Sequence, residues 1–526
     1  MDANRQIARA AGTVALAILF GQIMGLARGI LVARQFGASP ELDAFFAANR
    51  VSETLFLLVA GGALGSAFIP TFTGLLARDE KDSAWRLASS IGNAVLLTLS
   101  LLAALIAFFA PEVVRFALAP GLSSDPNLFA LTISLLRIQL ISTILFGLGG
   151  LIVGILNAHQ IFLIPALTPA LYQIGIIFGA VILAPSMGVY GLAWGVVIGA
   201  ILYLFVQIPS LLKLIADRRS LSAGLWSLDL RNPHVRSVIL LMGPRLIGVA
   251  VVQLNFWVNT WLASQMAYGS VTGLYYGFSL MIMAQAVIAQ SVAIAAMPTF
   301  SAQHALGKQD EMRSSLASSL RGVILLALPA SVGLIVLREP IISLLYRRGE
   351  FDERSVQIVS WALLWYAAGL VGHSIMEVLT RAFYAQHDTK TPVIIGTAAM
   401  LLNVIFSVAF SRYFASIGWM PHGGLALANS LATALEAAAL FVTMRKRLNG
   451  IEGGRILRGA IPSLIAAGIM SLALVAFLNS SGVLNIWLLA PIGIALGGAA
   501  YFASLWLMRV PELGYILNGV MRKFKR

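Results

Sequence analysis

Residues 91–108, IGNAVLLTLSLLAALIAF, contain no charged side chain and form one unbroken apolar run. A hydrocarbon core of about 30 Å is crossed by about 20 apolar residues in α-helical conformation. The run lies within a longer stretch, 84–109, and stretches of this kind recur along the 526-residue chain. They decide the fold class, because in lipid the peptide groups of a helix find their hydrogen-bond partners within the same segment.

The composition is typical of a membrane protein. Hydrophobic residues make up 59% of the chain and charged residues 11%, and the mean hydropathy is +0.87. A net charge of +14 would suggest nucleic-acid binding in a soluble protein, but here Lys and Arg cluster between apolar stretches, so no nucleic-acid partner is expected. The absence of cysteine excludes disulfides and thiolate metal sites, and the six His form no cluster with metal-ligand spacing. No metal site or cofactor is expected.

The pattern predicts an all-α polytopic membrane protein with fourteen transmembrane helices. The first follows Arg5 and Arg9 directly and lacks a small-residue cleavage site, so we expect a span there and not a cleaved signal. The fourteen stretches lie near 10–35, 43–76, 84–109, 127–156, 160–183, 187–212, 237–266, 270–300, 315–337, 354–385, 391–413, 422–444, 457–477 and 486–508.

Positive charge alternates between the two sides of the predicted spans. Cytoplasmic loops carry an excess of Lys and Arg, and this excess sets the orientation. With the N-terminus inside, the even-numbered gaps hold Arg78, Lys81, Lys213, Arg218, Arg219, Arg231, Arg236, Lys308, Arg313, Lys390, Arg445, Lys446, Arg447 and Arg455. The opposite gaps 184–187, 267–269, 414–421 and 478–485 hold neither residue type. The basic tail ends inside, so we expect a multi-pass inner-membrane protein with both termini in the cytoplasm.

Three short sequence islands recur at a nearly constant offset. Pro70-Thr71-Phe72 returns as Pro298-Thr299-Phe300, residues 158–165 as 385–392, and Gly191-Leu192-Ala193 as Gly424-Leu425-Ala426. The spacing predicts a duplicated unit of six helices. A unit with an even number of spans keeps its orientation when duplicated, which is the parallel-repeat design of some transporters.

The repeat predicts two pseudo-symmetric six-helix lobes plus two C-terminal helices. The limits are 1–217 for the N-terminal lobe, 218–236 for a cytoplasmic linker, 237–448 for the C-terminal lobe, and 449–526 for the last two spans with their basic cytoplasmic tail.

Charged residues inside the first two spans are the main candidates for function. An ionisable side chain in a span costs about 2.5–3.5 kcal/mol, so it usually faces a bundle interior or a watery cavity. Arg28 is interpreted as part of a cationic site for an anionic headgroup. For Arg34, near a helix end, snorkelling to the interface is the favoured interpretation, and gating or ion pairing is the alternative. Asp43 could control access or pair with Arg28, or its carboxylate could complement a helix N-terminus.

Two further pairs stand at helical spacing. Arg50 and Glu53 are three residues apart, and a local ion pair is the simpler interpretation. His373 and Glu377 are four apart and could form a proton-linked pair, but a structural hydrogen bond is the simpler interpretation.

Several motifs resemble the MurJ/MviN family over essentially the whole chain. They are Gly25-Leu26-Ala27-Arg28, Ala33-Arg34-Gln35-Phe36-Gly37, Asp43-Ala44-Phe45-Phe46, Gly61-Gly62-Ala63, Ala67-Phe68-Ile69-Pro70, Met242-Gly243-Pro244, Asn259-Thr260, Tyr275-Tyr276, Arg381-Ala382-Phe383-Tyr384-Ala385 and Asp388-Thr389-Lys390-Thr391-Pro392. The resemblance implies a transporter and not an enzyme. It implies two lobes, a central cavity, and a flippase that moves lipid II, the undecaprenyl-pyrophosphate-linked peptidoglycan precursor, from the inner to the outer leaflet by alternating access.

The family pattern of cavity arginines is only partly present. Members commonly have four, and alignment retains Arg28 while placing Gln22, Phe56 and Ser279 at the other three positions. The resemblance therefore implies substrate contacts at Arg28, Gln22 and Ser279. Arg50 and Arg245 are candidates for replacement charge.

A sodium site of the family type is incomplete in this sequence. Some members bind sodium through an Asn and an Asp one turn apart in the eleventh span, whereas this chain has Asn403 and Ser407. Coupling to membrane potential or a cation stays open. We expect lipid II or a related polyprenyl-linked glycan and membrane lipids as partners, and a monomeric protein. The alternatives are a related transporter of another polyprenyl-linked glycan or a small cation, and a membrane enzyme acting on polyprenyl phosphates through the loop 347–354.

Overall fold

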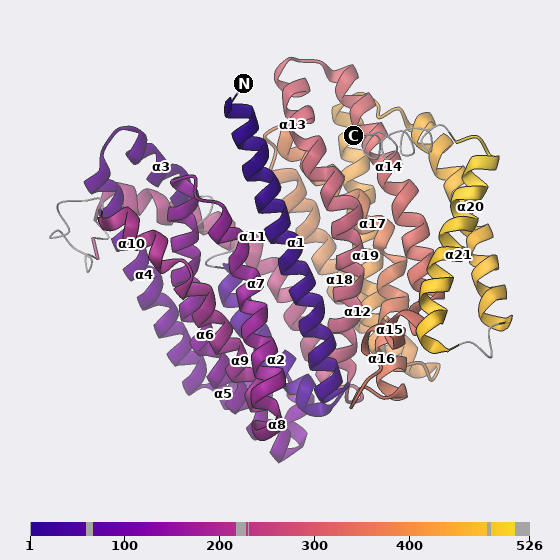
Figure 1. Cartoon of the computed structure of the whole chain (residues 1–526), viewed down its shortest axis with the longest axis horizontal. Helices are drawn as coiled ribbons and strands as arrows, with labels where there is room; N and C mark the ends of the chain where they lie inside the picture. Colours follow the sequence, from indigo (N-terminus) through magenta and orange to yellow (C-terminus); the bar gives the residue numbers. More distant parts are fainter. Residues whose placement is uncertain (1, 59–66, 217–227, 230, 481–484, 511–526) are drawn as a thin grey trace. The chain divides into compact units, whose positions relative to one another are not determined.

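The computed structural model describes residues 2–58, 67–216, 228–229, 231–480 and 485–510, with the side chains of 2–15, 244, 245 and 247 outside that description. All regular structure in this part of the chain is helical (Figure 1). The predicted motif 61–63, the basic residues Arg218 and Arg219, and the C-terminal basic tail lie outside the described residues.

The helices of the first half are α1 (Asp2–Phe36), α2 (Pro40–Phe56), α3 (Ile69–Ala77), α4 (Lys81–Phe108), α5 (Ala110–Glu112), α6 (Pro126–Ala158), α7 (Leu163–Phe178), α8 (Ala184–Met187), α9 (Val189–Phe205), α10 (Ile208–Ala216) and α11 (Pro233–Ser264). Those of the second half are α12 (Ser270–Gln285), α13 (Ser291–Ala305), α14 (Gln309–Val336), α15 (Arg338–Tyr346), α16 (Glu353–Ala368), α17 (Leu370–Ala385), α18 (Lys390–Ser416), α19 (His422–Arg447), α20 (Gly453–Ser480) and α21 (Ile486–Leu507).

The membrane-spanning fold is confirmed. Among the described residues, 11 helical stretches are long and apolar enough to cross a membrane, or up to 13 if each of two bent helix pairs forms one span. The remaining predicted span, 43–76, contains residues 59–66, which lie outside the description. Each predicted stretch begins and ends close to an observed helix or helix pair, because the length of an apolar run follows the membrane thickness.

The chain divides into two compact units. Unit 1 comprises Met1–Val271 and Arg348–Phe351, and unit 2 comprises Thr272–Arg347 and Asp352–Arg526. Helix α11 groups with unit 1 because it packs on α2 and α4. The predicted domain limits rest on the sequence repeat, which is a different criterion from contact, and they remain a prediction.

The turns between helices repeat within the two halves. Gln160 and His387 have positive φ angles of 60° and 59° and stand 387 − 160 = 227 residues apart. Their N–H groups donate to Asn157 O and Tyr384 O, which are separated by the same offset. Asp79 and Gly307, another pair at offset 228, also have positive φ. The backbone therefore follows the same path through corresponding turns, as expected for a duplicated six-helix unit.

A break in unit 2 shows how a span tolerates a bend. Helices α16 and α17 meet at 47°, and Gly369 separates them. A β-carbon there would overlap Ser430 Oγ of α19. Ser430 Oγ donates to Trp365 O at 2.7 Å, and Ser331 Oγ of α14 donates to Ala367 O at 2.7 Å. Neighbouring hydroxyls thus satisfy carbonyls near the break, which is how bends persist where water is scarce.

Helices α7 and α9 of unit 1 are in backbone contact. A β-carbon on Gly175 would overlap the backbone of Gly199, and one on Gly179, the residue after α7, would lie 2.5 Å from Gly195 Cα. Small residues at such spacing let helix backbones approach closely.

We predict that Gly175→Ala weakens this contact and destabilises the folded protein by about 1–3 kcal/mol, the usual cost of overpacking. The midpoint of thermal unfolding in detergent measures the effect. Gly322→Ala is the matched control, because a β-carbon at Gly322 meets nothing within 4 Å. Equal midpoints for the two variants would show that α7 and α9 do not pack this closely.

Candidate functional site

A three-residue turn between α1 and α2 positions the first charged residues. Gly37 adopts a φ of 59°, a conformation that favours glycine. The Ser39 hydroxyl then accepts a hydrogen bond from the N–H of Leu42 at 3.2 Å and caps α2. This corner places Arg34 in the last turn of α1 and Asp43 in the first turn of α2.

Asp43 is buried and tied to the loop that follows α11. The residue is only 2% exposed, and Oδ2 accepts a hydrogen bond from the main-chain N of Gly269 at 2.6 Å. The carboxylate also stands in the first helical turn, where negative charge is favourable. Asp43 therefore joins the start of α2 to a loop 226 residues away in sequence. No feature of the sequence indicated that this loop is its partner.

The three predicted residues on α1 differ in exposure. Arg28 is half-buried, whereas Gln22 and Arg34 are exposed. Exposure of Arg34 at the helix end agrees with the snorkelling interpretation. The main-chain oxygen of Arg34 accepts a hydrogen bond from the N–H of Glu350 at 2.9 Å. Beside it, Gly349 has a φ of 59°, and a β-carbon on it would overlap that same oxygen.

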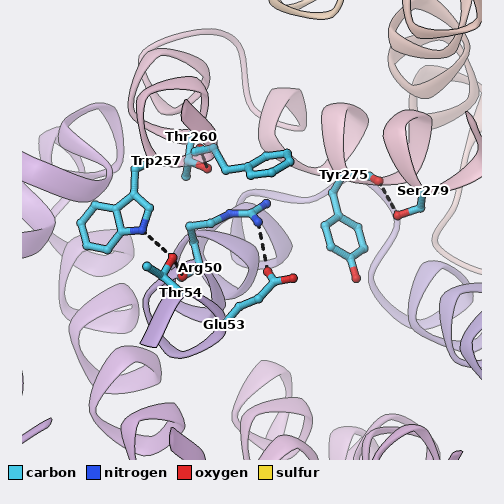
Figure 2. A network of polar contacts seen from close by, with 8 residues as sticks. Arg50, Glu53, Thr54, Trp257, Thr260, Tyr275 and Ser279 are labelled. Carbon is cyan, nitrogen blue, oxygen red and sulfur yellow. Dashed lines mark hydrogen bonds and ion pairs between the residues drawn. The ribbon is translucent and has the colours of Figure 1, made fainter. Parts of the chain in front are cut away.

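Arg50 on α2 lies in a network of polar contacts (Figure 2). Its Nη1 forms an ion pair with Glu53 Oε2 at 3.0 Å, as the three-residue spacing predicts. The guanidinium carbon lies 5.0 Å from the centroid of the Phe256 ring of α11, within the range of a cation–π contact. The Nε atom of Arg50 is buried and has no hydrogen-bond partner among the described residues.

A second contact joins the same two helices next to Arg50. Figure 2 shows Trp257 Nε1 donating to Thr54 Oγ1, at 2.8 Å. The Thr54 hydroxyl in turn donates to Arg50 O at 2.7 Å. A side-chain hydrogen bond in an apolar setting has little competition from water. These two hydrogen bonds therefore hold the turn of α2 that contains Arg50 in place against α11. Nothing in the sequence pointed to Phe256 and Trp257, since an aromatic pair inside an apolar span gives no distinguishing signal.

The positions that replace family arginines have two different surroundings. Phe56 packs against Phe146 and Tyr203 of unit 1, with ring centroids 4.9 and 6.5 Å away. Ser279 on α12 of unit 2 is exposed, and its hydroxyl donates to Tyr275 O at 2.7 Å (Figure 2). Phe56 thus extends an aromatic cluster, while Ser279 keeps a small polar surface. The side chain of Arg245 lies outside the described residues.

His373 does not pair with Glu377, and it makes a structural hydrogen bond, the simpler of the two interpretations, with a different residue. His373 Nε2 lies 3.1 Å from Asn429 Oδ1 on α19, and Glu377 forms an ion pair with Arg381 at 3.1 Å. Residues four apart on a helix face the same side, but each of these side chains finds its partner elsewhere. In unit 2, Ser407 Oγ donates to Asn403 Oδ1 at 3.0 Å, so the pair considered for sodium is held by its own hydrogen bond.

The turn between α17 and α18 carries the most specific family signature. Asp388 accepts hydrogen bonds from Thr391 N at 3.0 Å and Thr391 Oγ1 at 2.6 Å, and it pairs with Arg447 Nη2 at 2.6 Å. The Arg447 guanidinium also lies 5.3 Å from the Phe383 ring centroid. Burial raises the pKa of Asp388, but the Thr391 hydrogen bonds and the Arg447 charge outweigh it and lower the pKa to about 2. The signature therefore ties the start of α18 to the end of α19.

Comparison with known proteins gives a consistent result along the chain. The model of one protein family, described as "Lipid II flippase MurJ", matches residues 32–490. The lipid II flippase MurJ of Burkholderia cenocepacia is 32% identical over 511 residues, covering 95% of this chain and 97% of that protein. The probable lipid II flippase MurJ of Vibrio cholerae is 30% identical, covering 83% of each.

Two solved structures show similar folds. A lipid II flippase MurJ in an inward closed conformation is 27% identical with a TM-score of 0.78, covering 94% of this chain and 98% of that chain. An inward-facing multidrug resistance MATE family transporter of the MOP superfamily is 16% identical with a TM-score of 0.65, covering 82% and 96%. The second likeness concerns the fold alone.

We predict that Asp388→Asn lowers the free energy of unfolding by about 1–2 kcal/mol. This is less than the full value of a charge-assisted hydrogen bond, because Arg447 is partly exposed and water screens the ion pair. A depressed carboxyl pKa gives stability that is present above the ordinary value of 3.8 and lost as the pH falls towards about 2. The difference in unfolding midpoint between variant and wild type should therefore be constant from about pH 5 to about pH 8. A difference that changes within this window would contradict the assignment.

Proposed function

The chain belongs to the MurJ lipid II flippase family, and on this premise we propose that it moves lipid II from the cytoplasmic to the outer leaflet. The observation that carries the proposal is the match to lipid II flippases over nearly the full length of the chain. It favours a transporter over a membrane enzyme. It also favours lipid II over another polyprenyl-linked glycan or a small cation, because the matched relatives share that cargo in their names.

The physical task explains why guanidinium groups are suited to it. A pyrophosphate with a sugar-peptide head cannot enter hydrocarbon without losing its hydration, which costs several kcal/mol or more. A solvated path that opens alternately to each side avoids this cost, and rocking of two repeats with little internal change provides such a path. Guanidinium binds phosphate oxygens in bidentate fashion and stays charged at any physiological pH.

We assign roles to the predicted site residues on this basis. Arg28 holds the pyrophosphate, and its half-buried place on a membrane-spanning helix supports the role. Arg50 supplies further positive charge, supported by a guanidinium that Glu53 and Phe256 hold in place. Gln22, Arg245 and Ser279 contribute contacts to the headgroup.

Gating is assigned to the charged residues around the helix ends. Asp43 controls access through its bond to the loop after α11. Arg34 acts with it at the end of α1, and Glu53 acts as the partner of Arg50.

The proposal also covers the membrane in which the protein works and the energy source that drives transport. We place the protein in the bacterial cytoplasmic membrane as a monomer, with both termini inside. The membrane potential is worth about 2.3 kcal/mol per elementary charge per 100 mV, enough to drive movement of an anionic headgroup. Sodium is not part of this proposal, because Asn403 already accepts the Ser407 hydroxyl and Ser407 brings no carboxylate to the pair.

We predict that Arg28→Ala abolishes growth in a strain depleted of its own lipid II flippase, whereas Arg34→Ala has a smaller effect. Loss of one charge-assisted contact costs about 1.5–3 kcal/mol, or roughly tenfold or more in lipid II affinity. Complementation, with membrane levels of both variants compared by immunoblot, makes the measurement. Full growth with Arg28→Ala at a normal level would assign Arg28 to structure.

The orientation is tested separately. A cysteine introduced at Ser416, the exposed last residue of α18, should react with an impermeant reagent added outside. One at Ser220, which lies outside the described residues, should react only from the cytoplasmic side. The chain has no native cysteine to interfere. Reversed labelling would overturn the positive-inside assignment.

A further inference from the structure

The ion pair between Arg50 and Glu53 is unequal in its surroundings. The Arg50 side chain is 17% exposed, whereas that of Glu53 is 40% exposed. Arg50 is held on another side by the Phe256 ring, 5.0 Å from its guanidinium carbon. Its helix turn is fixed by the Trp257–Thr54 hydrogen bond. The cation is thus the fixed member of the pair, and the carboxylate is the member with access to solvent.

The two contacts of Arg50 differ in how easily they can be exchanged. A partly exposed ion pair one helical turn apart is a weak interaction, because water competes for both charges. A competing anion can therefore take the place of the carboxylate readily. The aromatic face of Phe256 is neutral and offers no charge to give up, so it keeps its place over the guanidinium when the carboxylate leaves.

We propose that Glu53 is an exchangeable counter-ion, which occupies the Arg50 guanidinium in the absence of cargo and yields it to an oxygen of a lipid-linked pyrophosphate. Phe256 is the positioning residue that keeps the guanidinium oriented during the exchange. The inference rests on the proposed function, since it concerns how the same anionic headgroup is bound. It extends that function in two ways. Glu53 competes with the headgroup for the Arg50 guanidinium, and Phe256, which is not among the positions of the family's cavity arginines, orients that guanidinium.

The exchange has a physical consequence for transport. An arginine cannot lose its proton at physiological pH, so without Glu53 its charge would have no internal partner after the cargo leaves. The Arg50 side chain is 17% exposed, and a guanidinium carries five N–H donors, so it has donors besides the Nη1 that Glu53 holds. Competition from Glu53 lowers affinity for the headgroup and favours its release, which a carrier needs as much as binding.

The test measures affinity by native mass spectrometry of the full-length protein with two probes, lipid II and undecaprenyl pyrophosphate. Glu53→Gln should raise affinity for both probes about two- to fivefold, because a competitor of ion-pair strength is removed. Phe256→Leu should lower it about two- to fivefold by loss of the cation–π contact, and Phe256→Tyr should restore it. Glu377→Gln, which breaks the comparable Arg381 pair of unit 2, is the matched control and should change neither affinity.

The outcomes separate this inference from the proposed function. If the wild type binds lipid II and Glu53→Gln leaves that affinity unchanged or weakens it, the exchange is wrong and the flippase assignment still holds. If the variants change affinity for undecaprenyl pyrophosphate as expected but the protein does not bind lipid II, lipid II is not the cargo and the exchange is supported. Affinity no higher in Phe256→Tyr than in Phe256→Leu overturns the positioning role. If Glu53→Gln does not fold, Glu53→Asp, whose shorter side chain weakens the pair, should raise affinity in the same direction.

Discussion

Hydrocarbon offers no hydrogen-bond partner to a peptide group or a charge, and the arrangement of this chain follows from that constraint. The backbone meets it with helices, and where a helix is interrupted, side chains supply the missing partners. The break at Gly369 is an example, with Ser430 and Ser331 donating to carbonyls on the N-terminal side of it. The same constraint keeps α7 and α9 in backbone contact, because packing replaces the hydrophobic driving force between helices in lipid.

Charged residues in the spans are subject to the same constraint, and four of the described ones meet it by pairing locally. Arg50 pairs with Glu53 and Glu377 with Arg381, in each case within about one turn of one helix. A local pair of this kind is weak, so it forms and opens easily. That property suits a carrier, which holds an anionic headgroup for only part of its cycle. The position of Phe56 shows another solution, in which an aromatic side chain joins the Phe146 and Tyr203 cluster instead of offering charge.

Much of the fold could be predicted from the sequence, because apolar length and membrane thickness are directly related. The stretch 84–109 became α4 and 391–413 became α18, with ends shifted by a few residues. The repeat was visible in three islands, and the structure adds the matching positive φ of Gln160 and His387. Helix α15 was not expected, since Arg338–Tyr346 is short and mixed in charge. Periodicity and apolar length give no signal for a helix of that size.

The sequence by itself determined that the chain is helical and spans a membrane, that its halves repeat, and that Arg28, Asp43 and Arg50 are unusual for their setting. These properties are local, since they depend on which residues follow one another along one helix. Only the tertiary structure decided that Asp43 binds the Gly269 N–H, that His373 pairs with Asn429 and not with Glu377, and that Phe256 lies over Arg50. Each of those contacts joins different helices or a helix and a distant loop. The side an individual side chain faces is set by packing between elements, which the order of residues along the chain does not state.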